Sequence, residues 1–252
     1  MKFLKYIRFL GFGIFFMFLL IGGYFIFYPE PEGMKRQEIE ESLADCYLKD
    51  LIDGRLDELL NQDSFSSTQN GKSVDNEEEW EDNGWYTRDG ITYTPDYAKG
   101  RIDCVLEIPS IRLRRGVYTG TWEEIQYNLD IWMVTVARPD YEYGKTHYCI
   151  YGHNHTVQNL SFNRLKDVKQ GDLFTLTSAA YGKDTYQVTE IFAEWREIVT
   201  ENIVDNFELP EDECYIITCG RGENRYKDLV VKGKRIAHQS VEGLKGEAGK
   251  DL

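Results

Sequence analysis

The sequence has few cysteines and no C-x-x-C pair. This absence excludes zinc ribbons and thioredoxin-type redox motifs, which need two thiols at that spacing. A small disulfide scaffold is also excluded, because a chain of 252 residues can bury a core without such bridges. The five cysteines are Cys46, Cys104, Cys149, Cys214 and Cys219. An odd number leaves at least one thiol free unless it pairs between chains.

Positive charge is scarce as well. The chain carries 29 Lys and Arg against 43 Asp and Glu, a net charge of −14. Nucleic-acid-binding proteins concentrate Lys and Arg on one surface, so the composition argues against that class of partner. An acidic surface mainly indicates solubility. The 42% of hydrophobic residues is enough to form a core.

One long apolar run, residues 9–27, follows Lys2, Lys5 and Arg8 near the N-terminus. About 20 apolar residues span a bilayer core as a helix, and the basic side of such a helix stays in the cytoplasm. We therefore expect residues 1–30 to form a signal-anchor, with the rest of the chain outside the cytoplasmic membrane. A cleaved signal peptide is the alternative. The length of the run and the lack of a small-x-small cleavage site favour the anchor.

Residues 31–98 are expected to form an N-terminal helix followed by an acidic linker. Apolar residues recur every three or four positions between residues 35 and 61, which predicts an amphipathic helix packed on the main domain. Residues 62–84 are rich in Ser, Asn, Asp and Glu and predict a loop or linker.

Short apolar segments with turn residues between them dominate residues 99–240. Candidate strands are residues 106–108, 111–113, 131–136, 147–151, 173–177, 186–191, 214–219 and 229–236. Many short strands at this spacing predict a β-sandwich or β-barrel. Short helical pieces are expected near residues 161–168 and 201–207. Residues 241–252 read as a polar C-terminal tail.

Two candidate strands end at side chains that could perform nucleophilic catalysis. His153 follows the segment 147–151, and Cys219 ends the segment 214–219. A cysteine nucleophile reacts as the thiolate and needs a base or a cationic partner. Arg221 and Arg225 follow the cysteine, and a guanidinium can stabilise a thiolate or an oxyanion.

This constellation resembles the sortase family over residues 103–236. The resemblance rests on four segments: CVLEIPSI at 104–111, YGHN at 151–154, FNRL at 162–165 with Gly171-Asp172, and ITC at 217–219. The interval from His153 to Cys219 is 219 − 153 = 66 residues, which is typical of the family. The resemblance implies a mainly β fold, a closed barrel of about eight strands with short helices, after a transmembrane helix and an amphipathic helix.

The resemblance also implies a mechanism and its partners. Cys219 attacks a Leu-Pro-x-Thr-Gly-like sorting motif, His153 is the acid and base, and the acyl group passes to an amine of a cell-wall precursor or pilin. Asn154, Thr218 and Arg221 are the expected substrate-binding residues, and no cofactor or metal is implied. The segment GHN at 152–154 and the N-terminal helix resemble class B sortases.

The arginine departs from the family pattern. The family's arginine usually stands directly before the last apolar strand, where this chain has Asp228. A local insertion would give the role to Arg225, and Arg221 and Arg235 are the alternatives.

Four other hypotheses explain less of the sequence. A metal site of His147, Cys149, His153 and His155 would have its ligands along one strand, which cannot close a tetrahedron. An L,D-transpeptidase would carry Ser-x-Gly-Cys, which is absent at Cys219. A papain-like peptidase has its cysteine before its histidine, the reverse of this order. A non-catalytic adhesion module on a membrane stalk would need no reactive thiol.

Overall fold

The computed structural model describes residues 31–52, 85–88, 92–95, 98–154 and 162–248. The predicted anchor in residues 1–30, the linker in residues 62–84 and the side chain of His155 lie outside these residues. Within the described ranges, none of the helices combines the length and apolar character that crossing a bilayer requires.

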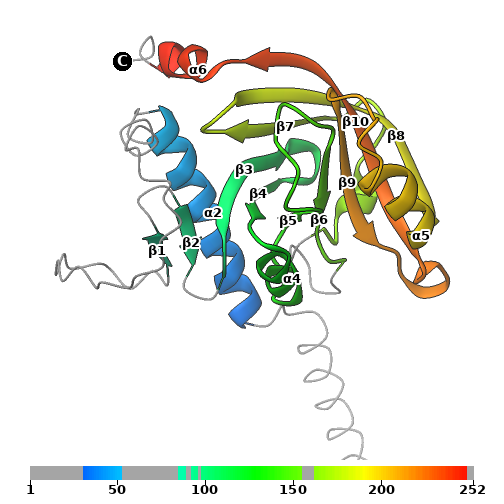
Figure 1. Ribbon diagram of the computed structural model, residues 1–252. Coiled ribbons are helices and arrows are strands. Elements are labelled where there is room, and N and C mark those ends of the chain that lie inside the picture. The colour runs from blue at the N-terminus through cyan, green and yellow to red at the C-terminus, as the bar shows by residue number, and fades with distance from the viewer. Residues whose placement is uncertain (1–30, 53–84, 89–91, 96–97, 155–161, 249–252) are drawn as a thin grey trace, which may run out of the picture. The chain divides into compact units, whose positions relative to one another are not determined.

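Eight strands close into a barrel, which confirms the predicted barrel (Figure 1). Around the barrel the strands follow the order β10-β8-β7-β3-β4-β5-β6-β9. Two pairs, β4 with β5 and β6 with β9, are parallel, and the others are antiparallel. The strands are β3 (Arg101–Ile108), β4 (Leu113–Thr119), β5 (Thr135–Val136), β6 (Tyr148–Tyr151), β7 (Leu173–Ser178), β8 (Gly182–Trp195), β9 (Glu213–Cys219) and β10 (Lys227–Gln239).

The interior of the barrel is filled by buried apolar side chains. Phe174 on β7 stacks on Tyr186 of β8 with ring centroids 5.0 Å apart. Gly233 on β10 faces this stack, and a Cβ there would lie 2.4 Å from the Phe174 ring. All but the last residue of β9 are buried, and its two edges pair with β6 and β10. The apolar segment at residues 214–217 is typical of a strand covered on both faces.

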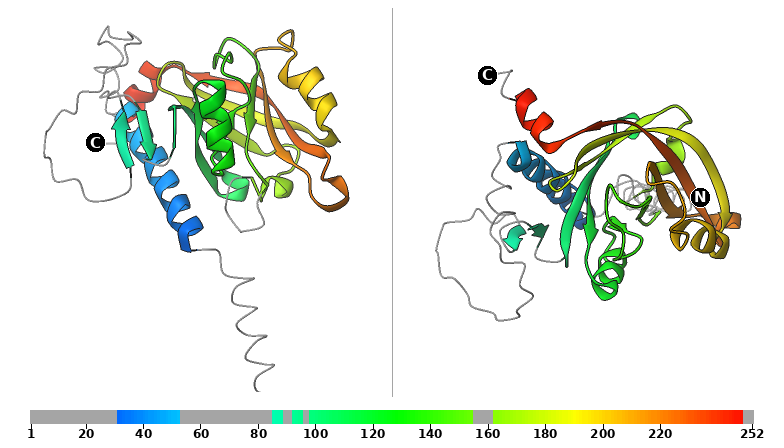
Figure 2. Two further views of the ribbon diagram at one scale, coloured as in Figure 1. Left: turned by 60° about the horizontal axis from the view of Figure 1, so that its bottom comes forward. Right: turned by 45° about the horizontal axis from the view of Figure 1, so that its top comes forward.

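The described helices are α2 (Pro31–Ile52), α4 (Trp122–Asp130), α5 (Arg196–Val199) and α6 (Val241–Ala248), and a hairpin joins β1 (Trp85–Arg88) to β2 (Thr92–Pro95). On α2, Leu43, Tyr47 and Leu51 are buried in one cluster with Val105 and Tyr118 of the barrel. The amphipathic helix predicted from residue 35 thus packs its apolar stripe on the main domain. Figure 2 shows the long strands β8 and β10 running together, with α5 beyond the end of β8.

Residues 131–136 differ from the prediction of one strand. Helix α4 ends at Asp130, Trp132 adopts a left-handed φ of 74°, and the strand is confined to Thr135–Val136. A left-handed residue commonly ends a helix, so the apolar run is divided between a helix end and a short strand. Helix α4 itself was not predicted. Its sequence signal is a capping box, in which Thr121 and Glu124 each bond the other's backbone N–H.

The other helical predictions differ at their ends. The turn predicted at residues 161–168 contains a 3₁₀ turn, η2 (Leu165–Asp167). The piece predicted at residues 201–207 begins earlier, as α5, and continues as a π-helical turn, η3 (Thr200–Val204). The predicted polar tail contains α6.

Candidate active site

The parallel pairing of β6 with β9 brings the two candidate catalytic residues to the same end of the barrel. Tyr151 is the register partner of Ile217, so two residues further along both strands the pair is His153 and Cys219. The backbone N–H of Gly152 donates to the Ile217 carbonyl at 3.2 Å. Neighbouring parallel strands place register partners on the same face of the sheet. The fold therefore brings the backbone segments of His153 and Cys219 together although 66 residues separate them in the sequence.

The three predicted substrate-binding residues connect these two strand ends. The Thr218 hydroxyl is buried and donates to the Gly152 carbonyl at 2.7 Å. The Asn154 amide donates to the Cys219 carbonyl at 2.9 Å. The Arg221 guanidinium donates to the Asn154 carbonyl at 3.0 Å through Nε and 2.5 Å through Nη2. These bonds fix the separation between the histidine and cysteine segments. Their side chains therefore have a positioning role that the sequence did not indicate.

Among the barrel thiols, Cys219 is the accessible one. It is partly exposed, whereas Cys104, Cys149 and Cys214 are fully buried. Burial raises the pKa of Cys219, the nearby Arg196 guanidinium opposes that rise, and Asp228 adds to it. Burial raises the pKa of Cys149 to about 12 although a contact with Tyr141 opposes the rise, so that thiol stays protonated and unreactive. Cys46, also partly exposed, packs against the α2 cluster away from these strand ends.

Two residues at the thiol were missed by reasoning from the sequence. Asp228 is the register partner of Cys219 on β10, and its side chain is fully buried. Its Oδ1 accepts a hydrogen bond from Nε of Arg196 at 3.2 Å. Arg196 begins α5, directly after β8. The presence of an aspartate at the family's arginine position was the available signal, but it did not reveal the partner.

Arg225, the arginine assigned from the sequence, lies in the exposed turn between β9 and β10. It caps the 3₁₀ turn η4 (Gly222–Asn224), and its guanidinium lies 4.7 Å from the ring centroid of Tyr226. In the part of the chain that the structure describes, its side chain forms neither a hydrogen bond nor an ion pair. Arg235 lies at the opposite end of β10, paired with Asp184.

An aromatic side chain contacts the candidate acid and base. The Trp132 ring lies 4.9 Å from the His153 ring, centroid to centroid, with the two planes tilted by 57°. Trp132 is 38% exposed and holds the left-handed backbone conformation described above. That conformation costs a non-glycine residue about 1–2 kcal/mol. This contact could not be predicted from the sequence, where residues 131–136 read as one strand.

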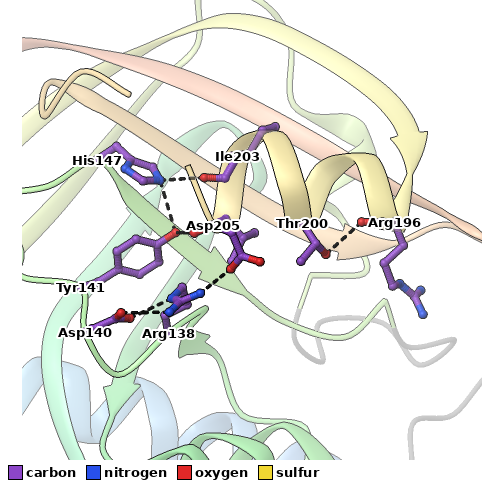
Figure 3. A network of polar contacts seen from close by, with 9 residues as sticks. Arg138, Asp140, Tyr141, His147, Arg196, Thr200, Ile203 and Asp205 are labelled. Atoms are coloured by element: carbon purple, nitrogen blue, oxygen red, sulfur yellow. Dashed lines mark hydrogen bonds and ion pairs between the residues drawn. The ribbon is translucent and has the colours of Figure 1, made fainter. Parts of the chain in front are cut away.

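The described residues contain no group of three His, Cys, Asp or Glu side chains suited to a metal ion. His147 has a different environment: it is buried, and its Nε2 lies 2.8 Å from the Ile203 carbonyl and 3.3 Å from the Tyr141 hydroxyl (Figure 3). Burial lowers the pKa of His147. It therefore anchors the segment after α5 to the barrel.

The chain is similar to one protein family and to several solved structures. The family model of the sortase domain matches residues 106–236. Sortase A of Listeria monocytogenes is 26% identical, with 55% of this chain and 90% of that chain covered and a TM-score of 0.47. Sortase C-1 of Actinomyces oris is 24% identical, with 53% and 73% covered and a TM-score of 0.42. No curated protein matches the chain.

The class B resemblance stays a prediction. The family match spans more than half of the 252 residues and includes both candidate catalytic residues, His153 and Cys219. The chain belongs to the sortase family of cysteine transpeptidases.

Proposed function

We propose that this enzyme cleaves a Leu-Pro-x-Thr-Gly-like sorting motif through a thioester on Cys219 and transfers the acyl group to an amine. The observation that supports this most directly is the parallel pairing of β6 with β9, since His153 and Cys219 each lie two residues beyond the register pair Tyr151 and Ile217 at one end of the barrel. A partly exposed thiol beside an imidazole is the arrangement that nucleophilic cysteine catalysis requires.

The first half-reaction follows from these groups. His153 takes the thiol proton of Cys219, and the thiolate attacks the carbonyl carbon of the threonine in the motif. The new C–S bond forms as the carbonyl electrons move to oxygen, where a guanidinium stabilises the charge. The sequence assigns that guanidinium to Arg225, whereas the contacts around the thiol favour Arg196. The intermediate then collapses, the C–N bond breaks, and His153 gives its proton to the leaving amine.

The second half-reaction reverses these roles. An incoming amine attacks the thioester, the new C–N bond forms, and the C–S bond breaks. His153 removes a proton from the amine, and the thiol of Cys219 is restored. We propose that the incoming amine, which accepts the acyl group, belongs to a cell-wall precursor or to a pilin lysine.

The location proposed for this reaction comes from the N-terminal sequence. The apolar run at residues 9–27, after three basic residues, supports a single-pass anchor with the catalytic domain outside the cytoplasmic membrane. Surface proteins that carry sorting motifs and their amine acceptors are found on that side.

The test uses the full chain in detergent with a panel of Leu-Pro-x-Thr-Gly-like peptides and an amine, beside the variant Cys219→Ala. We expect a ligated product and a thioester on Cys219 by mass spectrometry with the wild type, and neither with the variant. If no peptide gives a product or an acyl-enzyme, the transpeptidase proposal is wrong for these motifs. A non-catalytic module would then be the better description.

A further inference from the structure

A buried carboxylate lies directly opposite the nucleophile. Asp228 is the register partner of Cys219 in the antiparallel β9–β10 pair. Such partners share one face of the sheet, with Cβ atoms about 4.5–5.5 Å apart. Asp228 is 0% exposed, and its Oδ2 is buried without a hydrogen-bond partner in the described structure. Burial raises the pKa of Asp228, and Arg196 opposes the rise. A carboxylate in this position destabilises the fold unless a cation compensates it.

Arg196 is that cation, and it keeps most of its donors unused. Its Nε donates to Asp228 Oδ1 at 3.2 Å, while half of its side chain is exposed. Arginine carries five N–H donors in a planar fork. Within the described part of the chain, the guanidinium of Arg196 forms its hydrogen bond through Nε–H. The N–H donors on Nη1 and Nη2 are therefore left for a bound molecule.

The backbone of Arg196 is fixed on both sides. The preceding residue, Trp195, pairs with Lys227 at the end of the β8–β10 ladder. The N–H of Arg196 donates to the Tyr226 carbonyl at 3.2 Å, and its own carbonyl accepts from the Thr200 hydroxyl at 2.9 Å.

The segment that follows Arg196 is anchored to the barrel a second time. Ile203 bonds His147, and Asp205 pairs with Arg138 (Figure 3). In Figure 3 the Arg196 side chain extends away from this network. The guanidinium is therefore attached to a rigid element.

Arg196 interacts electrostatically with the thiol as well as with Asp228. The guanidinium opposes the rise that burial causes in the pKa of Cys219. Burial lowers the pKa of Arg196, and Asp228 and the Cys219 thiolate raise it above its ordinary value. The competing arginines are engaged elsewhere. Arg221 holds the Asn154 carbonyl, and the Arg225 guanidinium lies over the Tyr226 ring in an exposed turn.

We propose that Arg196 is the catalytic arginine of this enzyme and that Asp228 is a positioning residue that holds it beside Cys219. The proposal rests on the proposed function of Cys219. The Nη donors of Arg196 bond the carbonyl oxygen of the scissile threonine as its negative charge develops. The arginine thus comes from the β8–α5 junction, and an aspartate occupies the strand position where the family usually has the arginine.

The first test compares Arg196→Gln, Arg196→Lys and Arg225→Gln in the full chain. Loss of one oxyanion donor typically lowers turnover about 10²–10³-fold. We expect a loss of that size in kcat for Arg196→Gln, a smaller loss for Arg196→Lys, and a change under about threefold for Arg225→Gln. If Arg225→Gln gives the large loss and Arg196→Gln does not, the assignment is wrong.

The second test needs no substrate. The pKa of Cys219 is measured from the pH dependence of its alkylation by iodoacetamide, with labelled sites assigned by peptide mass spectrometry. We expect Arg196→Gln to raise this pKa. Asp228→Asn should lower kcat at least tenfold, because Arg196 loses its anchor. It should shift the pKa of Cys219 less than Arg196→Gln does, because the loss of the carboxylate lowers this pKa while the displacement of Arg196 raises it.

The matched control is Lys234→Gln. The Lys234–Asp212 pair has nearly the same length, 3.1 Å, and its lysine is 52% exposed, but it lies further along β10. We expect it to change neither kcat nor the pKa of Cys219.

In the double variant Arg196→Gln, Asp228→Arg, the guanidinium moves to the strand position opposite Cys219, and kcat should recover at least tenfold over Arg196→Gln.

The two proposals fail differently. If the wild type turns over no peptide while the alkylation shifts appear, the transpeptidase function fails and the placement of the pair at the thiol stands. If neither variant moves the pKa of Cys219, the placement itself is refuted.

Discussion

Two fully buried aspartates mark the two ends of the β8–β10 ladder, and they differ in how their oxygens are satisfied. Asp184 lies opposite His238, and its Oδ1 accepts from the His238 ring at 2.7 Å. Its Oδ2 accepts from Arg235 and from the Tyr186 hydroxyl, each at 3.2 Å. Among the described residues, Asp228 accepts one hydrogen bond, from Arg196, and its Oδ2 has no partner at hydrogen-bond distance, although the nearby Tyr151 hydroxyl helps to lower the pKa of Asp228.

The difference separates a structural ion pair from a functional one. A buried polar network stabilises a protein when every member is satisfied, and a partly satisfied group stabilises little or nothing. The cations differ in the same way, since Arg235 is 17% exposed and Arg196 is 50% exposed. The Asp184 end is built for stability, and the Asp228 end keeps donors free for chemistry.

The largest expected effect is on stability at the Asp184 end. Asp184→Ala removes the carboxylate that accepts hydrogen bonds from Arg235, His238 and Tyr186. The partly buried guanidinium of Arg235 then loses this acceptor. Breaking a buried ion pair from one side typically costs about 3–5 kcal/mol. We expect the free energy of unfolding, measured in urea, to fall by about that amount. The exposed Lys234→Gln should cost less than about 1 kcal/mol. Equal losses would remove the distinction between the two kinds of pair.

The next effect concerns Trp132, the strained residue at the Cys219 end. Trp132→Gly removes the ring that contacts His153 but relieves a left-handed conformation. Because these two changes oppose each other, the free energy of unfolding should change by less than about 1 kcal/mol. Turnover should fall about 10–100-fold, mainly in kcat, because the imidazole loses a packing partner.

Trp132→Phe keeps an aromatic ring beside His153 and should retain most of the activity. If Trp132→Gly loses stability and keeps its turnover, then the indole has a purely structural role.

The strand β9 and the two catalytic candidates next to it could be proposed from the sequence for a physical reason. The strand β9 is buried up to Thr218, so its sequence is apolar from Cys214 to Ile217, just before Cys219. His153 likewise follows the short buried strand β6. A change from an apolar run to a reactive side chain is a local signal, and one sequence contains it.

Arg196 could not be found in this way. Its place beside Cys219 depends on the register of β8 against β10 and of β10 against β9, and neither register is written in the residues near the cysteine. Trp132 was missed because an apolar run at a helix end has the same composition as a strand. At this site, the register between distant strands and the point where a helix ends could thus not be predicted from the sequence pattern.

A smaller effect is expected on the stability of Asp228→Asn. Because the pKa of Asp228 is raised in the folded state, the folded protein binds a proton that the unfolded chain has released. Wild-type stability therefore falls as pH rises from the ordinary aspartate pKa through the raised one. The asparagine in the variant does not titrate, so the stability of the variant should not fall in this way as pH rises. We expect it to be more stable than the wild type by about 1 kcal/mol at pH 8 and no more stable at acidic pH.

Thermal unfolding of both proteins across this pH range checks the sign. A variant that is less stable at pH 8 would mean that the Asp228–Arg196 pair stabilises the fold, as the Asp184 network is expected to do.

The smallest expected effect is a salt dependence of the thiol. Arg196 is half exposed, so dissolved ions screen its interaction with Cys219, whereas the fully buried Asp228 is screened far less. Arg196 lowers the pKa of Cys219 and Asp228 raises it. Higher salt should therefore weaken the interaction with Arg196 before the interaction with Asp228 and shift the pKa of Cys219 upward.

Measuring alkylation against pH at about 0.01 M and about 1 M salt spans Debye lengths of about 30 Å and 3 Å. The shift should disappear in Arg196→Gln and persist in Arg235→Gln, because Arg235 lies at the other end of the ladder. A shift that is the same in all three proteins would assign the effect to the net charge of the whole chain.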